Sequence, residues 1–175
     1  MKDLGEACYV LGIKICRDSK RRTLALSQAT YIDKILERFS MENSKNRKLP
    51  SRYEITLCKD QCPKTSQKEE DMRKYSYALA VESLLYVMLC TRFDICYIVW
   101  IVSRYKFNSG LEDWIAIKHI LKYLPRMIDL MLVYFGGDFN SIGYTDFDFQ
   151  LDKNSQKSTS GPQNKAMSWD VEFTP

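Results

Sequence analysis

The fold is decided by residues 77–89, which have the sequence YALAVESLLYVML and open a long apolar block. Drawn as a helix, this run is apolar nearly all round, and such a helix is covered on most sides by packed protein. Thr91 and Asp94, three residues apart, predict a capping box that ends this helix and begins the next. We expect that second helix over residues 95–105 and a third over residues 111–124. The sequence therefore predicts a helical centre against which the rest of the chain packs.

A membrane hairpin is the rival interpretation of this block. Each apolar run is shorter than the roughly 18 to 20 residues that span a bilayer. Glu82, Arg92 and Asp94 also lie within it, and a charge at bilayer depth costs a few kcal/mol. We therefore expect a soluble core. Glu82 must then reach solvent, pair with a cation such as Arg92, or take up a proton, because an isolated buried carboxylate is strongly destabilising.

The chain before the block predicts a β-hairpin, a helix and a long connection. Residues 9–15 and 23–26 are rich in strand-forming side chains and enclose a polar turn. Apolar residues recur at helical spacing within Ser27–Phe39. Residues 41–70 show no period and contain two prolines, so we expect a connection there.

After the block, residues 130–135 and 141–149 predict two strands joined by a glycine turn. The expected fold class is therefore α+β, with an N-terminal β-hairpin, a central block of about four helices and a C-terminal β-hairpin. Length fits one ordinary domain, or one domain with part of another, since the chain has 175 residues.

The charge of the chain is unevenly distributed. Its net charge is +4, but residues 14–48 hold ten Lys or Arg against four Asp or Glu, a local excess of +6. Residues 138–152 hold four Asp and no basic residue. A basic region beside an acidic one suits a polyanion contact next to a cation site. Two solvated faces without a ligand are the open alternative.

The six cysteines and the single histidine predict neither a disulfide framework nor a zinc site, because no set of four ligands has metal-site spacing. Residues 1–3 do not begin a signal peptide, so we expect an intracellular, reducing compartment and free thiols. No nucleophile motif, phosphate-binding glycine loop or dinucleotide fingerprint is present.

Several stretches together resemble one family, the Pol polyprotein of copia-type LTR retrotransposons in plants. Each is weak alone, but their order and spacing over residues 1 to about 169 make the resemblance specific. The stretches are Leu4–Ala7, Tyr9–Ile13, Leu26–Gln28, Tyr31–Ile32, Ser83–Tyr86, Cys90–Ile95, Ser103–Tyr105, Trp114–Lys118, Ile120–Leu124, Gly143–Asp146 and Lys157–Gly161.

The resemblance implies which segment of the polyprotein this chain corresponds to. Residues 1–127 would correspond to the primer grip, thumb and connection of reverse transcriptase. Residues 128–175 would form an incomplete RNase H-like domain, so that the C-terminal hairpin starts its sheet. Asp146 would then match the first metal-binding carboxylate of RNase H and be both its catalytic and its metal-ligating residue.

Catalytic activity is not expected from this chain. The polymerase motif of the family, Tyr-x-Asp-Asp, does not occur in it. RNase H chemistry needs about four carboxylates around two metal ions, and the later ones are expected beyond the matched segment. We therefore expect a truncated remnant in which Asp146 is vestigial. No cofactor is expected, and Mg²⁺ or Mn²⁺ would bind only if the RNase H-like site were completed.

Two other functions stay open. One is an RNase H-type nuclease whose missing carboxylates come from another chain. The other is a nucleic-acid-binding module, which would bind RNA–DNA hybrid or DNA weakly, without sequence preference and in a salt-dependent way. We expect no membrane partner and no small-molecule substrate. The residues that would contact nucleic acid crowd the N-terminal hairpin and are Lys14, Arg17, Lys20, Arg21 and Arg22.

Overall fold

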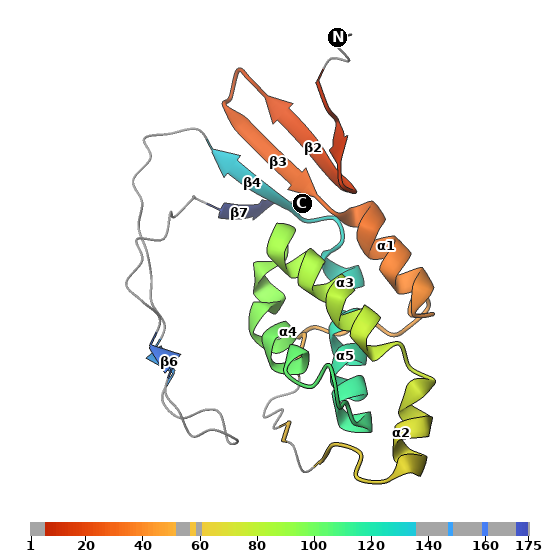
Figure 1. Ribbon diagram of the computed structural model, residues 1–175. Coiled ribbons are helices and arrows are strands. Elements are labelled where there is room, and N and C mark those ends of the chain that lie inside the picture. Colours follow the sequence, from red (N-terminus) through yellow and green to blue (C-terminus); the bar gives the residue numbers. More distant parts are fainter. Residues whose placement is uncertain are drawn as a thin grey trace, which may run out of the picture.

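The computed structural model describes residues 6–51, 57–58, 61–135, 147–148, 159–160 and 171–174, and it confirms the α+β class. A five-stranded antiparallel sheet lies at one end of the molecule and a group of helices at the other (Figure 1). The sheet has the order β1-β2-β3-β4-β7. Its strands are β1 (Tyr9–Val10), β2 (Ile13–Asp18), β3 (Thr23–Ser27), β4 (Met131–Phe135) and β7 (Val171–Thr174).

The predicted N-terminal hairpin is confirmed as β2 and β3, which pair from Lys14 with Ser27 to Asp18 with Thr23. β1 precedes them and turns into β2 through Leu11 and Gly12, both of which have positive φ angles, 50° and 82°. Glycine adopts this conformation without strain, whereas leucine does so rarely.

The predicted helices of the central block are confirmed, with boundaries that differ by a few residues. The helix expected before the block also forms, as α1. The helical elements are α1 (Ala29–Arg38), α2 (Ser66–Arg73), α3 (Tyr77–Cys90), η2 (Phe93–Ile95), α4 (Cys96–Ser103), α5 (Leu111–Tyr123) and η3 (Leu124–Met127).

Helix α2 begins within the stretch that was predicted to be a connection and ends three residues beyond it. Its sequence, SQKEEDMR, has one apolar residue, Met72, and only that side chain packs against the core. A helix without an apolar stripe leaves no periodic signal in the sequence.

The core lies among α1, α3, α4 and α5. Ala80, Val81, Leu84 and Val87 of α3 are fully buried, as the apolar run predicted. Glu82 is exposed and also pairs with a cation, so the first two of its three predicted possibilities hold together. The cation is Lys106 and not Arg92, and Glu82 Oε1 accepts a hydrogen bond from Lys106 Nζ at 2.7 Å. No helix in the described part of the chain is long and apolar enough to cross a membrane.

The capping box predicted at Thr91 and Asp94 is wrong. Thr91 Oγ1 instead donates to Gln28 Oε1 at 2.6 Å, while the Asp94 carboxylate accepts hydrogen bonds from Arg92 and Tyr123. Arg92 is 1% exposed and needs acceptors inside the protein. The Asp94 side chain supplies them and is therefore not available to cap a helix.

The C-terminal hairpin differs from its prediction. Both edges of β4 are occupied, by β3 on one side and β7 on the other. Of that predicted second strand only β5 (Phe147–Asp148) lies in the described part, and it pairs with β6 (Thr159–Ser160). The division into domains at residue 127 and the RNase H-like sheet stay predictions.

Candidate nucleic-acid interface

The turn between β2 and β3 carries three consecutive cations at the end of the sheet remote from the helices (Figure 1). The Asp18 carboxylate orders this turn, because its Oδ1 accepts the backbone N–H groups of Lys20 at 2.9 Å and Arg21 at 3.1 Å. Arg22 has a φ of 51° and returns the chain into β3. The three cations, Lys20, Arg21 and Arg22, are exposed and form the hairpin tip.

The tip keeps most of its positive charge. Arg21 Nε lies 3.8 Å from Asp18 Oδ2, with side chains that are 84% and 46% exposed. An exposed pair at this distance contributes about 0–1 kcal/mol and is screened by salt. Three cations against one carboxylate therefore leave a net charge of about +2 available to a polyanion.

The five predicted hairpin cations do not share one face. Lys14 pairs with Ser27 and Arg17 pairs with Leu24. Because successive residues of a strand point to opposite faces, Lys14 and Arg17 lie on opposite faces of the sheet. Both are exposed. A ligand that contacts the hairpin tip can therefore meet one of these two residues on the same side, but not both.

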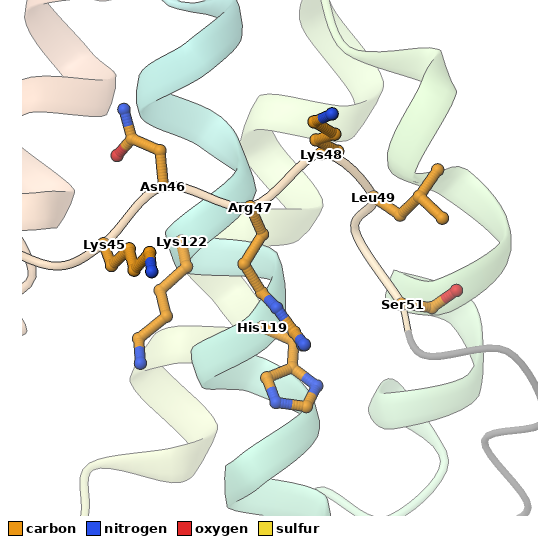
Figure 2. Close-up of a pocket in the computed structure, with 8 residues that line it drawn as sticks. All are labelled: Lys45, Asn46, Arg47, Lys48, Leu49, Ser51, His119 and Lys122. Carbon is orange, nitrogen blue, oxygen red and sulfur yellow. The ribbon is translucent and has the colours of Figure 1, made fainter.

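A second group of basic residues gathers where sequence reasoning predicted only a connection. The chain segment 45–51, here called the strap, crosses α5, and the backbone N–H of Arg47 donates to the carbonyl of Lys122 at 2.9 Å. A pocket of about 750 Å³ lies between them, here called the strap pocket (Figure 2). Its lining residues are Lys45, Asn46, Arg47, Lys48, Leu49, Ser51, His119 and Lys122.

The strap pocket left a partial signal in the sequence. Lys45, Arg47 and Lys48 contribute to the basic excess of residues 14–48. His119 and Lys122 lie on α5, about seventy residues further along the chain, and only the tertiary fold brings them to the strap. Their spacing of three residues on a helix places both on one face.

The predicted metal-binding residue, Asp146, lies outside the described residues, as do Asp138 and Asp152. Asp148 is part of β5, whose backbone alone is described. No group of three or more His, Cys, Asp or Glu that could hold a metal ion occurs in the rest of the described chain. The metal-binding and catalytic roles of Asp146 therefore stay predictions.

Buried acidic groups elsewhere in the structure have structural partners. Burial raises the pKa of Asp113 to about 6, although the backbone N–H of Gly110 donates to its Oδ2 at 2.7 Å and lowers it in part. For Asp94, burial alone would raise the pKa, but hydrogen bonds from Arg92 and Tyr123 outweigh it and leave the pKa lowered. Neither carboxyl lines the strap pocket. Both belong to the packing of the helices.

No protein-family model matches the chain, and no solved structure shows significant similarity to it. The chain is 44% identical over 161 residues, 92% of its length, to a retrovirus-related Pol polyprotein from transposon TNT 1-94 of Nicotiana tabacum. It is also 30% identical over 164 residues to an uncharacterised mitochondrial protein of Arabidopsis thaliana, and 32% identical over 91 residues to the secreted RxLR effector protein 161 of Plasmopara viticola.

The chain spans 12% of the tobacco polyprotein, 63% of the Arabidopsis protein and 64% of the Plasmopara protein. The first two similarities each cover 92% of this chain, and so include both the hairpin and the central helical block.

Proposed function

The chain is a relative of retrotransposon Pol polyproteins, and from that premise we propose that it is a remnant of a copia-type Pol that contacts nucleic acid without catalysing a reaction. The proposed ligand is an RNA–DNA hybrid or DNA. The proposed contact is between the hairpin tip, with Lys14 or Arg17 beside it, and the phosphates of the backbone.

The single observation that carries the binding proposal is the position of the hairpin tip. Lys20, Arg21 and Arg22 follow one another in the turn between β2 and β3, at the end of the sheet away from the helical core (Figure 1). No buried contact in the described structure requires three cations there, because all three are exposed. The copia resemblance equates Leu11–Ile13 with the primer grip. These residues lie at the opposite end of β2 from the tip, so the resemblance supports a primer-strand contact with the hairpin in general and not with its tip in particular.

The strength of such binding can be estimated. Each neutralised phosphate of a duplex contributes about −0.9 to the slope of log K against log salt concentration. Three or four contacts therefore predict a slope of about −3 to −4 and a dissociation constant that is roughly micromolar or weaker at physiological salt. Base-specific contacts are not part of the proposal, since contacts from lysine and arginine to backbone phosphates carry no sequence information.

The absence of catalysis is part of the same proposal. The 175 residues contain no Tyr-x-Asp-Asp motif, which the copia resemblance assigns to the polymerase centre. An RNase H-type reaction would require further carboxylates beside Asp146, supplied by another chain. We expect no metal-dependent hydrolysis of an RNA–DNA hybrid. Hydrolysis that disappears in Asp146→Asn would replace this proposal with the nuclease alternative.

The binding proposal is tested with a fluorescent RNA–DNA hybrid and a variant in which Lys20, Arg21 and Arg22 are all changed to Gln. A matched control removes three exposed cations from α1 and α2 by changing Lys34, Lys68 and Arg73 to Gln. Binding at low salt should weaken at least tenfold in the tip variant and much less in the control. An equal loss of affinity in both variants would show that only the net charge of the protein matters, and would contradict a contact at the tip.

A further inference from the structure

The strap pocket is lined by basic groups without a compensating acid. Lys45, Arg47, Lys48 and Lys122 carry four positive charges, and none of the described residues that line the pocket is acidic. Like charges held close together repel one another, and a bound anion would relieve that repulsion. The pocket volume of about 750 Å³ is large enough for a phosphate group together with water.

Arg47 is held in place before any ligand arrives. Its backbone N–H is fixed to the carbonyl of Lys122, and its half-buried side chain extends toward His119 (Figure 2). The Nη1 atom of its guanidinium is buried and has no hydrogen-bond acceptor among the described residues. A buried donor left without an acceptor destabilises the folded protein. An arginine that is positioned in this way is prepared for an acceptor from outside.

The dipole of α5 offers a different explanation for one of these charges. Lys122 lies in the last turn of α5, where the helix dipole favours a cation. The dipole explains neither Lys45 nor Lys48, which come from the strap and not from the helix. It also supplies no acceptor for Arg47 Nη1.

We infer that the strap pocket is a phosphate-binding site, with Arg47 as its fixed donor and Lys45, Lys48 and Lys122 as surrounding cations. The planar guanidinium donates to two phosphate oxygens at once, and lysines add charge at adjustable distance. The phosphate would come from the backbone of a polynucleotide or from a small phosphate compound. A polynucleotide source rests on the proposed function and would add a second contact beside the hairpin tip.

The single histidine of the chain gives a direct probe, because His119 lines the pocket. Its imidazole signals in an NMR spectrum can be followed while inorganic phosphate replaces chloride at constant pH and ionic strength. A saturable shift is expected with phosphate and none with acetate. A short RNA–DNA hybrid, titrated separately, should shift the same signals if a polynucleotide supplies the phosphate.

The variants locate the effect. Arg47→Gln should weaken phosphate binding about tenfold, since it removes a charge-assisted hydrogen bond. Arg47→Lys keeps the charge but loses the two-point donor and should weaken binding by a smaller factor. Arg38→Gln removes an exposed arginine of α1 and should leave binding unchanged. If Arg47→Gln does not fold, a double change of the exposed Lys45 and Lys48 to Gln tests the same site.

Each outcome is decisive. A shift with phosphate but not with hybrid supports the site and assigns it to small phosphate compounds. If phosphate shifts the His119 signals but the protein does not bind hybrid at all, the proposed nucleic-acid binding is contradicted and the inferred phosphate site is supported. The absence of a saturable shift with either phosphate or hybrid would overturn the inference, as would an identical shift in wild type and Arg47→Gln.

Discussion

Arg92 and Asp94 form a two-point ion pair, in which Arg92 Nε donates to Asp94 Oδ1 at 2.9 Å and Nη2 donates to Oδ2 at 2.6 Å. Arg92 Nη1 also donates to the carbonyl of Met127 at 2.8 Å, and Tyr123 donates to Asp94 Oδ2 at 2.7 Å. The pair therefore connects the junction of α3 and α4 to α5 and η3.

We predict that Asp94→Ala destabilises the protein by about 3–5 kcal/mol, because it leaves the guanidinium of Arg92 buried without its main acceptor. Asp94→Asn should cost less, since the amide oxygen keeps one acceptor. Urea unfolding at pH 7 measures both. An unchanged unfolding midpoint in Asp94→Ala would show that the pair does not hold the helices together.

The same pair predicts a loss of stability in acid. The folded-state pKa of Asp94 is lowered from its ordinary value of 3.8. The stabilisation is therefore complete above that ordinary value and disappears as pH falls through the lower folded-state pKa. The difference in unfolding free energy between wild type and Asp94→Asn should shrink below about pH 4. A difference that stays constant down to pH 2 would contradict the assignment.

Asp113 should have the opposite pH dependence. Its folded-state pKa is raised to about 6, chiefly because the side chain is buried, so the folded protein holds a proton that the unfolded chain has released between about pH 4 and pH 6. Its contribution is therefore fully present below the unfolded-state pKa and lost as pH rises through 6. Asp113→Asn keeps an acceptor for the Gly110 N–H. In this variant the free energy of unfolding should no longer fall, by up to about 3 kcal/mol, as pH rises through 6. Urea-unfolding midpoints of wild type and Asp113→Asn, each measured at pH 4.5 and pH 7.5, test this prediction.

Gly110 has no room for a side chain. A Cβ atom placed there would lie 2.5 Å from the backbone carbonyl oxygen of Gln61, and backbone cannot move aside as a flexible side chain can. Gly110→Ala should therefore destabilise the protein by about 1–3 kcal/mol. Ser109→Ala, one residue earlier, is the control and should change stability by less than about 0.5 kcal/mol. Equal stability of the two variants would contradict the close approach.

The sequence predicted the helical block because burial and helical period coincide there. Ala80, Val81, Leu84 and Val87 are apolar at the positions that the fold buries. It did not predict α2, whose polar sequence has no apolar stripe. The occupied edges of β4 were also missed, since pairing between residues so far apart in the chain has no local signature.

The candidate sites divide in the same way. The hairpin cations were visible because they are neighbours in the sequence, and the odd spacing of Lys14 and Arg17 already implied opposite faces of a strand. The strap pocket was visible only as part of the basic excess of residues 14–48, because Arg47 and His119 come together only in the folded chain. Asp94 was predicted to cap a helix because of its spacing from Thr91. In the structure its carboxylate instead accepts hydrogen bonds from the buried Arg92.

The most direct test of the central claim is the salt dependence of binding to an RNA–DNA hybrid, measured for wild type and for the variant with Lys20, Arg21 and Arg22 changed to Gln. The account predicts a wild-type slope of log K against log salt concentration of about −3 to −4, reduced in magnitude by about 2 to 3 in the variant. A slope near zero in wild type, or the same slope in both proteins, would contradict phosphate binding by the hairpin tip.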